Sequence, residues 1–242
     1  MTDDYRNLIY DRYVSLSKAA HVQAPSYKFN NSKILPLIEE WVKPIDKTAP
    51  CIDLGCGNGS LLNALKTLGF SNLFGVDISP EQIGLARRIV PNVAKGDLVE
   101  YLERFDRDYF GLICLFDVIE HLKKTEVVHL LELIHSRLLP GGTLIVHCPN
   151  GDSPFCSQIH FGDFTHETIL SPSSAQNLCL LFNFGRFEAK EHLGASLGVV
   201  GRLRYLAWRG LRLAIQLCHV VETGSRGSGV CTRNFAFKAI KT

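Results

Sequence analysis

The residues with the clearest chemical meaning are an aspartate and three alternate glycines, in the segment Asp53-Leu54-Gly55-Cys56-Gly57-Asn58-Gly59. Glycine adopts positive φ angles and has no Cβ, so such a segment can bring its backbone close to a ligand. Eighteen residues past Gly59, Asp77 ends a second apolar run. A carboxylate in that place can accept hydrogen bonds from both hydroxyls of a ribose. The pattern predicts a site for a nucleoside.

A dinucleotide site uses the same elements but requires the spacing Gly-x-Gly-x-x-Gly and a pyrophosphate at the helix end. Here the spacing is Gly-x-Gly-x-Gly, and Ser60 stands in the place of the third glycine. Asp53 would also put a carboxylate beside the diphosphate. A ligand that carries an amine fits this acid better.

Residue for residue, the glycine segment resembles motif I of the class I methyltransferases that use S-adenosylmethionine, and Asp77 matches their ribose-binding acid. The resemblance implies that S-adenosylmethionine is the cofactor. It also implies adenine contacts after the third strand and contacts to the methionine part along the fourth. The cofactor-binding residues predicted in this way are Asp53, Gly55, Cys56, Gly57, Asn58, Gly59, Asp77, Ile78, Gly96, Asp97, Leu98, Cys114, Leu115 and Phe116.

A second motif covers residues 110–122 and contains the pair Glu120-His121. It resembles the fourth motif of the small-molecule branch of this family, which includes the O-methyltransferases of ubiquinone synthesis. An alcohol acceptor holds its proton tightly at neutral pH, so a base or a metal must assist the transfer. The predicted catalytic residues are Glu120, His121 and His166, and His160 lies in the same loop as His166.

Asp117, Glu120 and His121 are spaced i, i+3 and i+4, which places them on one face if the segment is helical. With His166 they would form a mixed oxygen and nitrogen shell for a divalent ion such as Mg²⁺. The set resembles the metal ligands of the small-RNA ribose methyltransferases, although Asp117 is shorter than the Glu of that pattern. In the alternative, no metal is needed: Glu120 and His121 orient each other and the acceptor, and His121 is the base.

Apolar runs and helical patterns alternate from residue 50 onward, which predicts a parallel sheet covered by helices. Ligands of such sheets lie at the carboxyl ends of the strands. The resemblance implies an α/β, Rossmann-like fold with a seven-stranded, mostly parallel sheet of order 3-2-1-4-5-7-6. We expect strands at 50–54, 72–77, 92–95, 110–116, 143–148 and 186–192, an edge strand at 232–240, and helices within 1–42 and at 59–68, 80–89, 124–138 and 171–183.

The 242 residues, 46% of them hydrophobic, suit one domain with a modest appendage. Within it we expect an N-terminal helical cap (1–45), a cofactor-binding core (48–150), and an acceptor-side part (151–242) that includes an insert at 195–230 and a closing hairpin. Eight cysteines without a Cys-x-x-Cys pair, and no basic apolar leader, indicate reduced thiols in the cytoplasm.

Charge is unevenly distributed along the chain. Residues 186–242 contain ten Lys and Arg against three Glu, whereas residues 1–185 contain sixteen against twenty-one acids. Residues 201–221 combine arginines with apolar residues at helical spacing, so we expect a basic amphipathic helix. It would lie on an anionic membrane surface at the inner face, close the acceptor pocket or pair with a second copy in a homodimer.

The string Asp163-Phe164-Thr165-His166-Glu167 resembles methyltransferases found with bacterial surface-polysaccharide enzymes. On that resemblance the acceptor is a small-molecule or glycan hydroxyl, anionic or lipid-linked, and a sugar of a surface polysaccharide or its precursor is preferred. A polyprenyl phenol, an RNA ribose 2′-hydroxyl and a non-catalytic binding role remain alternatives. The net acidic body argues against nucleic acid.

Overall fold

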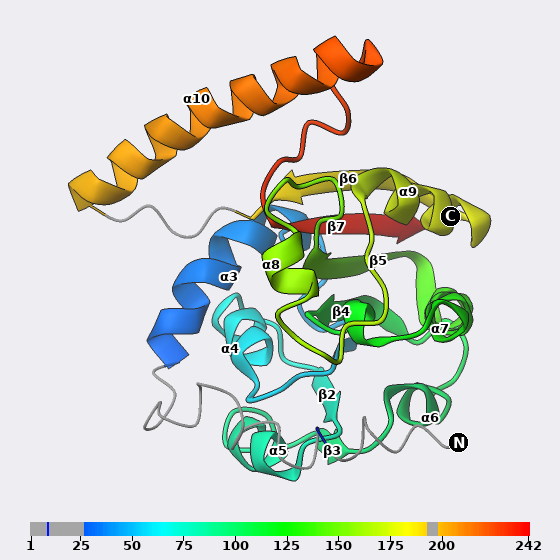
Figure 1. Ribbon diagram of the computed structural model, residues 1–242. Helices are drawn as coiled ribbons and strands as arrows, with labels where there is room; N and C mark the ends of the chain where they lie inside the picture. Colours follow the sequence, from blue (N-terminus) through cyan, green and yellow to red (C-terminus); the bar gives the residue numbers. More distant parts are fainter. Residues whose placement is uncertain (1–8, 10–26, 193–197) are drawn as a thin grey trace.

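The computed structural model describes residue 9 and residues 27–192 and 198–242. Its centre is a seven-stranded sheet of order β3-β2-β1-β4-β5-β7-β6 (Figure 1). Strands β1 to β5 pair in parallel, and β7 runs antiparallel to β5 and β6. The predicted fold class and strand order are confirmed. The strands are β1 (Cys51–Leu54), β2 (Leu73–Asp77), β3 (Val93–Lys95), β4 (Phe110–Phe116), β5 (Leu138–Pro149), β6 (Phe184–Glu191) and β7 (Asn234–Lys241).

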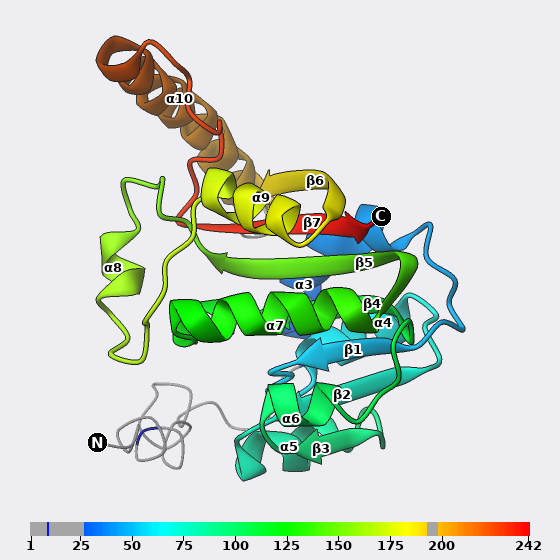
Figure 2. The ribbon, with the colours of Figure 1, turned by 90° about the vertical axis from the view of Figure 1, so that its right-hand side faces the viewer.

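Helices cover both faces of this sheet. On one face lie α3 (Tyr27–Val42), α4 (Ser60–Thr67) and α5 (Pro80–Ala86), and on the other lie α6 (Leu98–Leu102), α7 (Lys124–Arg137) and α9 (Pro172–Leu181) (Figures 1 and 2). The short helix α8 (Ser157–His160) and its loop lie at the end of the sheet toward which β5 points (Figure 2). The long helix α10 (Gly198–Thr223) projects beyond the β6 side (Figure 1).

The central strands are buried on both faces, which explains their nearly continuous apolar sequences. In β4, Leu112 and Cys114 pack in the core on one side, whereas Ile113 and Leu115 pack on the other, and all four are at most 1% exposed. Burial of one such aliphatic side chain stabilises the fold by about 1.5 to 3 kcal/mol. These two cores fix the sheet whose carboxyl-end rim carries the candidate site.

Several sequence predictions need correction. The strand expected at the edge, 232–240, is internal, because β7 lies between β5 and β6, and β6 forms the edge. The strand expected at 143–148 begins earlier, because β5 starts at Leu138; in its first part Gly141 has φ +76° and the β4–β5 register shifts. The short helices α6 and α8 were not expected. Expected helical positions within 1–8 and 10–26 lie outside the described residues.

Residues Ile119–His121 form a single 3₁₀ turn, η2, instead of an α-helix. The i, i+4 relationship expected between Asp117 and His121 therefore does not apply. Among the described residues, no helix combines the length and apolarity needed to cross a membrane.

Candidate functional site

The glycine segment forms the turn between β1 and α4, and its three glycines have left-handed backbone angles. φ is +75° at Gly55, +50° at Gly57 and +83° at Gly59. A Cβ at Gly55 would overlap Val118, and one at Gly59 would lie 3.0 Å from Ala86 Cα. A Cβ at Gly57 would meet no atom within 4 Å. Two of the glycines therefore permit close packing, and Gly57 borders open space where a ligand can approach the backbone.

Asp77, the last residue of β2, is bonded to this turn. Its Oδ2 accepts a hydrogen bond from the Gly57 N–H at 2.8 Å, and its Oδ1 accepts one from the Ser79 N–H at 2.8 Å. A carboxylate oxygen has two lone pairs, so each oxygen retains one for a further donor. Burial raises the pKa of Asp77, and the two backbone hydrogen bonds oppose that shift.

Asp53 lies within β1 and is only 2% exposed. Its Oδ1 has no hydrogen-bond partner among the described residues. Burial, and then the negative charge of Asp77, raise the pKa of Asp53 well above its ordinary value. An unsatisfied buried polar atom costs about 1 to 3 kcal/mol, so this oxygen marks a place for a donor from outside the chain.

The other predicted cofactor residues differ in burial: some are buried in the core, and others are partly or fully exposed near the strand ends. Cys56, Cys114 and Leu115 are buried, so the latter two, inside β4, can reach a ligand only through their backbone. Burial raises the pKa of the Cys114 thiol well above its ordinary value. Asp97 is the N-cap of α6 and accepts hydrogen bonds from Val99 and Glu100. The side chain of Asn58 accepts a hydrogen bond from Ser60, and Phe116 stacks on His147. Ile78 is exposed, whereas Gly96 and Leu98 are partly exposed.

The residues present fit S-adenosylmethionine. The open space at Gly57 lets a ligand approach the backbone, and the remaining lone pairs of Asp77 can accept from ribose hydroxyls. The orphaned Asp53 oxygen can accept from a further donor. These three residues would hold the cofactor, which supplies a methyl group on a positively charged sulfur when bound.

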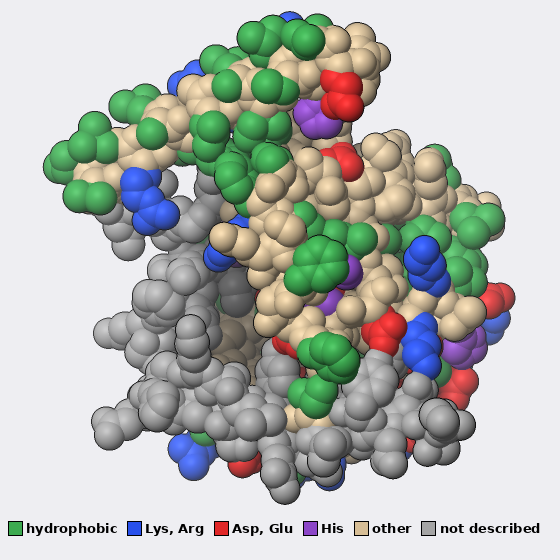
Figure 3. Space-filling model, viewed as in Figure 1, with side chains coloured by type: hydrophobic (Ala, Val, Ile, Leu, Met, Phe, Trp, Pro, Cys, Tyr) green, Lys and Arg blue, Asp and Glu red, His purple; other side chains and the backbone are tan. Residues whose placement is uncertain are grey.

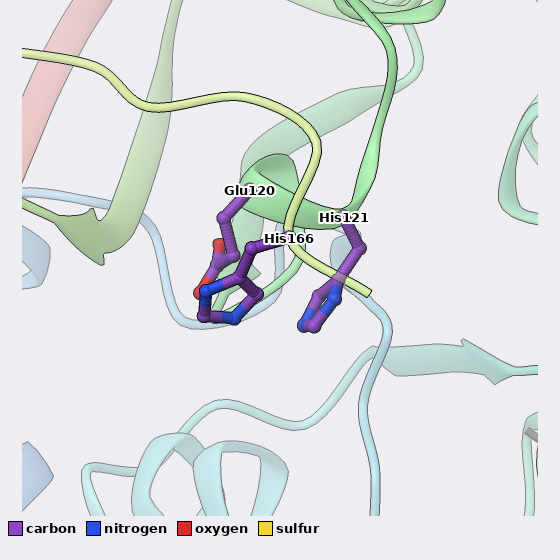
Figure 4. Close-up of side chains that lie close together, drawn as sticks. All are labelled: Glu120, His121 and His166. Carbon is purple, nitrogen blue, oxygen red and sulfur yellow. The ribbon is translucent and has the colours of Figure 1, made fainter. Parts of the chain in front are cut away.

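Glu120, His121 and His166 come together beside the carboxyl end of β4. One ligand-type atom from each lies within 4.8 Å of the others. Glu120 and His121 belong to η2, whereas His166 comes from the loop after α8, and the three side chains point into the same space (Figure 4). Glu120 Oε2 and His166 Nδ1 are buried and have no hydrogen-bond partner among the described residues. Buried polar atoms are normally hydrogen-bonded, so these two atoms are the ones to which a ligand of the cluster would bind.

Backbone hydrogen bonds fix the loop of His166 onto η2. The N–H groups of Glu167 and Thr168 both donate to the Glu120 carbonyl, at 2.8 and 3.0 Å. The Thr168 hydroxyl donates to the Leu122 carbonyl at 2.6 Å. The relative position of His166 and Glu120 is thus set by the backbone as well as by side chains.

Thr165 determines which nitrogen of His121 carries the proton. The Thr165 hydroxyl lies 2.6 Å from Asp163 Oδ1 and 2.8 Å from His121 Nδ1. Hydrogen bonds from Thr165 hold the pKa of Asp163 below its ordinary value although burial opposes them, so the carboxylate is ionised and takes the only hydroxyl proton. We therefore assign the proton of His121 to Nδ1, and its Nε2 keeps the lone pair.

All three clustered side chains favour their neutral forms. Burial, and then the charge of Asp117, raise the pKa of Glu120 well above its ordinary value. Burial, and then repulsion from His166, lower the pKa of His121. Burial also lowers the pKa of His166. Two neutral imidazoles can accept protons or bind a cation, and a bound cation would favour ionised Glu120.

Asp117, expected as a metal ligand, lies outside this group. Its Oδ1 lies 2.8 Å from Nδ1 of His147 in β5. His147 in turn contacts His192, with 2.7 Å between Nε2 and Nδ1. Sequence reasoning did not identify either histidine. A signal was present, since His147 is a polar residue inside the apolar run of a buried strand.

Comparisons with known proteins agree with this architecture. A family described as a methyltransferase domain matches residues 27–221. A ribosomal protein L11 methyltransferase of Pelobacter propionicus is 35% identical over 115 residues, which cover 46% of this chain and 36% of the relative. One from Aliivibrio salmonicida is 30% identical over 107 residues, 43% of this chain and 35% of the relative. The matches span about a third of the length of these relatives.

Solved structures show the same fold. A methyltransferase dependent on S-adenosylmethionine from Archaeoglobus fulgidus superposes with a TM-score of 0.67 at 17% identity, covering 97% of this chain and 99% of the other. A possible histamine N-methyltransferase from Thermotoga maritima gives a TM-score of 0.62 at 15% identity, with coverage of 97% and 99%. With the family match over most of the chain and the site described above, we conclude that the protein belongs to the methyltransferase domain family, as a class I methyltransferase dependent on S-adenosylmethionine.

Proposed function

We propose that the protein methylates a hydroxyl group of a small molecule or glycan, with a sugar of a surface polysaccharide or its precursor as the acceptor. The observation that carries this proposal is the group of Glu120, His121 and His166 at the rim of the sheet. A hydroxyl needs help to lose its proton, and two neutral imidazoles beside the cofactor turn provide a base for it. An amine acceptor that is already unprotonated needs no such group.

In this proposal His121 is the base. Its Nδ1–H is held by Thr165, so Nε2 accepts the acceptor proton as the new oxygen–carbon bond forms. Asp163 stabilises the imidazolium through Thr165. Glu120 and His166 orient the acceptor oxygen, and the fixed loop keeps the reacting groups in place. In favourable systems such positioning lowers the barrier by about 7 to 11 kcal/mol.

Exposed aromatic rings support a glycan acceptor. Phe161 and Phe164 are 82% and 84% exposed, in the loop that carries His166. Apolar surface beside convergent polar groups is typical of small-molecule sites. A polyprenyl phenol would use the same rings, and an RNA ribose would use the same base, so both remain competing acceptors. Methylation of a protein, as the names of the L11 relatives state for them, is a further competitor.

A divalent ion is the second candidate for activating the hydroxyl. Glu120, His121 and His166 supply one oxygen and two nitrogen ligands within 4.8 Å, a set that suits Zn²⁺ or a similar ion and, less closely, Mg²⁺. The orphaned atoms of Glu120 and His166 favour this arrangement. Asp117 is not needed as a ligand.

We also propose that α10 binds an anionic membrane surface. None of its side chains is buried, and Leu203, Leu206, Leu213 and Leu217 are 59–67% exposed. Figure 3 shows hydrophobic side chains along the surface of this helix. The helix is attached to the domain through polar contacts instead: Trp208 donates to Glu191, and Arg212 donates to the Gly229 carbonyl.

In α10 the leucines are exposed and polar side chains contact the domain. A helix that packs on its own domain would instead cover its apolar face. The exposed Arg202, Arg204 and Arg209 lie on the same helix as the leucines, which suits lipids with negatively charged headgroups. These arginines account for part of the basic charge of the C-terminal segment. Phe155, from the loop before α8, lies 6.3 Å from Trp208 between ring centroids, so a lipid-linked acceptor would find membrane and site close together.

The proposal is tested by transfer of label from methyl-tritiated S-adenosylmethionine into a fractionated cell extract, with and without a chelator. We expect label in the polysaccharide or nucleotide-sugar fraction. Sensitivity to the chelator supports the metal. Label in RNA, quinone lipid or protein contradicts the proposed acceptor, and no transfer into any fraction contradicts the enzymatic role.

A further inference from the structure

A second set of ionisable side chains lies at the ends of three strands. Asp117 comes directly after β4, His147 lies near the end of β5, and His192 comes directly after β6. The His147 ring joins them, with 2.8 Å from Nδ1 to Asp117 Oδ1 and 2.7 Å from Nε2 to His192 Nδ1. The three residues form one hydrogen-bonded chain along the carboxyl-end rim.

The hydrogen-bonded chain of Asp117, His147 and His192 depends on a buried ring and a strained backbone. His147 is paired with Phe116 in the sheet register and is 3% exposed, and its ring stacks on Phe116 with centroids 5.5 Å apart. Asp117 has a left-handed φ of +55°, and its N–H donates to the His147 carbonyl at 3.0 Å. A non-glycine residue in this conformation costs of order 1 kcal/mol and is frequent at functional sites. The strained turn is what aims the carboxylate at the histidine.

The chemistry of the three side chains determines which atom donates and which accepts in each hydrogen bond. Partial desolvation works against ionisation of this exposed side chain, but the pKa of Asp117 is lowered, in part by the hydrogen bond from His147. An ionised carboxylate only accepts, so Nδ1–H of His147 donates to it. In the tautomer of His147 with its proton on Nδ1, Nε2 carries a lone pair and accepts from Nδ1–H of His192. One oxygen of Asp117 is thereby held, and Oδ2 makes no hydrogen bond to the described residues.

Asp117 is also linked to the cofactor turn and to the cluster of Glu120, His121 and His166. Its side chain is 60% exposed, and the next residue, Val118, packs against Gly55 of the cofactor turn. Its charge acts on Glu120, His121 and His166, the three clustered residues. An exposed carboxylate therefore lies next in sequence to a residue that contacts the cofactor turn, and its charge acts on the predicted base His121.

We propose that Asp117 is an acceptor-binding residue whose Oδ2 accepts a hydrogen bond from an acceptor hydroxyl, and that His147 and His192 are positioning residues for it. The proposal rests on the proposed hydroxyl methylation and narrows its acceptor class. One hydroxyl meets the base His121 and a neighbouring hydroxyl meets Asp117, so the acceptor carries a pair of adjacent hydroxyls. The negative charge of Asp117 disfavours an acidic group at this position.

The hydrogen bonds among Asp117, His147 and His192 are tested by nuclear magnetic resonance of the intact protein labelled with ¹⁵N-histidine at neutral pH. We expect His147 and His192 both to carry their proton on Nδ1, and the His147 proton to exchange slowly with water. In Asp117→Ala this protection is lost. A wild-type His147 protonated only on Nε2 overturns the proposal.

The role in acceptor binding is tested with His147→Phe, which keeps a ring on Phe116, and His147→Asn, which retains a donor near the Nδ1 position. Tritium transfer is measured against dilution of a dialysed cell extract, and affinity for S-adenosylmethionine by calorimetry. We expect His147→Phe to raise the half-saturating extract concentration about 10-fold or more, as loss of an outer-shell partner does at metal sites. Cofactor affinity stays unchanged, and His147→Asn recovers most of the loss. The control His129→Phe, on the exposed side of α7, behaves as wild type.

Two results overturn the role. Equal loss of cofactor affinity and acceptor use in His147→Phe, or no recovery in His147→Asn, makes His147 a structural residue only. Absence of transfer by the wild-type protein instead contradicts the proposed function, and the resonance experiment distinguishes that case by showing the chain intact.

Discussion

The carboxylate of Asp77 and the backbone of Gly57 are directly hydrogen-bonded, with 2.8 Å between Oδ2 and N, although 20 residues separate them. The bond joins the end of β2 to the glycine turn after β1. The same carboxylate also accepts from Ser79, at the start of α5. The acid predicted to bind ribose therefore also shapes the turn that lies beside it.

Asp77→Ala removes both the ribose acceptor and the bond to Gly57. We expect affinity for S-adenosylmethionine to fall by at least 100-fold, since hydrogen bonds to a charged group contribute about 1.5 to 3 kcal/mol each. Asp77→Asn keeps an acceptor oxygen and should lose less. Calorimetric titration of both variants is the measurement, and an unchanged affinity of Asp77→Ala would reject the ribose role.

Gly57→Ala and Gly59→Ala should separate binding from folding. A Cβ at Gly59 meets the Ala86 backbone at 3.0 Å, whereas one at Gly57 enters open space. Both positions have positive φ, so each alanine costs about 1 kcal/mol of strain. We expect Gly59→Ala to reduce the free energy of unfolding by about 2 kcal/mol or more, and Gly57→Ala to weaken cofactor binding more than stability. Denaturant unfolding and calorimetry measure the two effects, and equal stability losses would contradict this assignment.

Asp53→Asn should stabilise the ligand-free protein at alkaline pH. The pKa of Asp53 is raised in the folded state, so the folded protein binds this proton more tightly than the unfolded chain does. Its contribution to stability is complete below 3.8, the ordinary pKa, and is lost as pH rises through the folded pKa. We expect the variant to gain about 1 to 3 kcal/mol at pH 8 and nothing near pH 4. Urea unfolding at both pH values tests this, and a gain that is the same at both would refute it.

The pH dependence of methyl transfer reports on His121. Because its pKa is lowered, the neutral base is the main form at neutral pH. We expect the rate to rise with pH through a value below 6.5, the ordinary imidazole pKa, and then to stay level. His121→Asn should abolish this rise together with most of the activity. A rate that keeps rising above pH 8 in the wild type would point to a different base.

Helix α10 should bind vesicles that contain anionic phosphatidylglycerol and not vesicles of neutral phosphatidylcholine alone. Replacing Leu206, Leu213 and Leu217 by serine removes exposed apolar surface without touching the contacts of Trp208 and Arg212. We expect flotation with vesicles to drop at least 10-fold in this variant. Gln216→Ser, on the same helix, is the matched control. Loss of a dimer in the triple variant, with no vesicle binding by the wild type, would instead identify a homodimer contact.

Local patterns were sufficient to predict the sheet and the cofactor turn, because alternating apolar runs and the glycine spacing act within short segments. The β4 strand and a helix that begins at residue 80 were expected on such grounds, and the structure adds that Ser79 caps this helix, α5, by accepting from Gln82. The strand order, with β6 at the edge, was predicted from the family resemblance, because local patterns do not show that the last strand inserts beside β5. The 3₁₀ turn at 119–121 was missed, because the sequence spacing fits an α-helix equally well.

The candidate site was predicted only in part for a similar reason. Glu120 and His121 stand in a recognisable motif, and His166 was named from the loop that follows the fifth strand. His147 and His192 are 45 residues apart and meet only because β5 and β6 end at the same rim. Thr165, which fixes the His121 tautomer, is an ordinary loop residue in sequence. Such contacts depend on packing between distant segments, which spacing alone does not encode.

The central claim is that a methyl group is transferred to an oxygen activated by His121. The most direct measurement uses S-adenosylmethionine with a ¹³C-labelled methyl group, the wild-type protein or His121→Asn, and a dialysed cell extract. The carbon chemical shift distinguishes an oxygen-bound methyl group from a nitrogen-bound one. We predict an O-methyl resonance in the carbohydrate fraction that is absent with His121→Asn. An N-methyl resonance in the protein or amine fraction, unchanged by that substitution, would contradict the account.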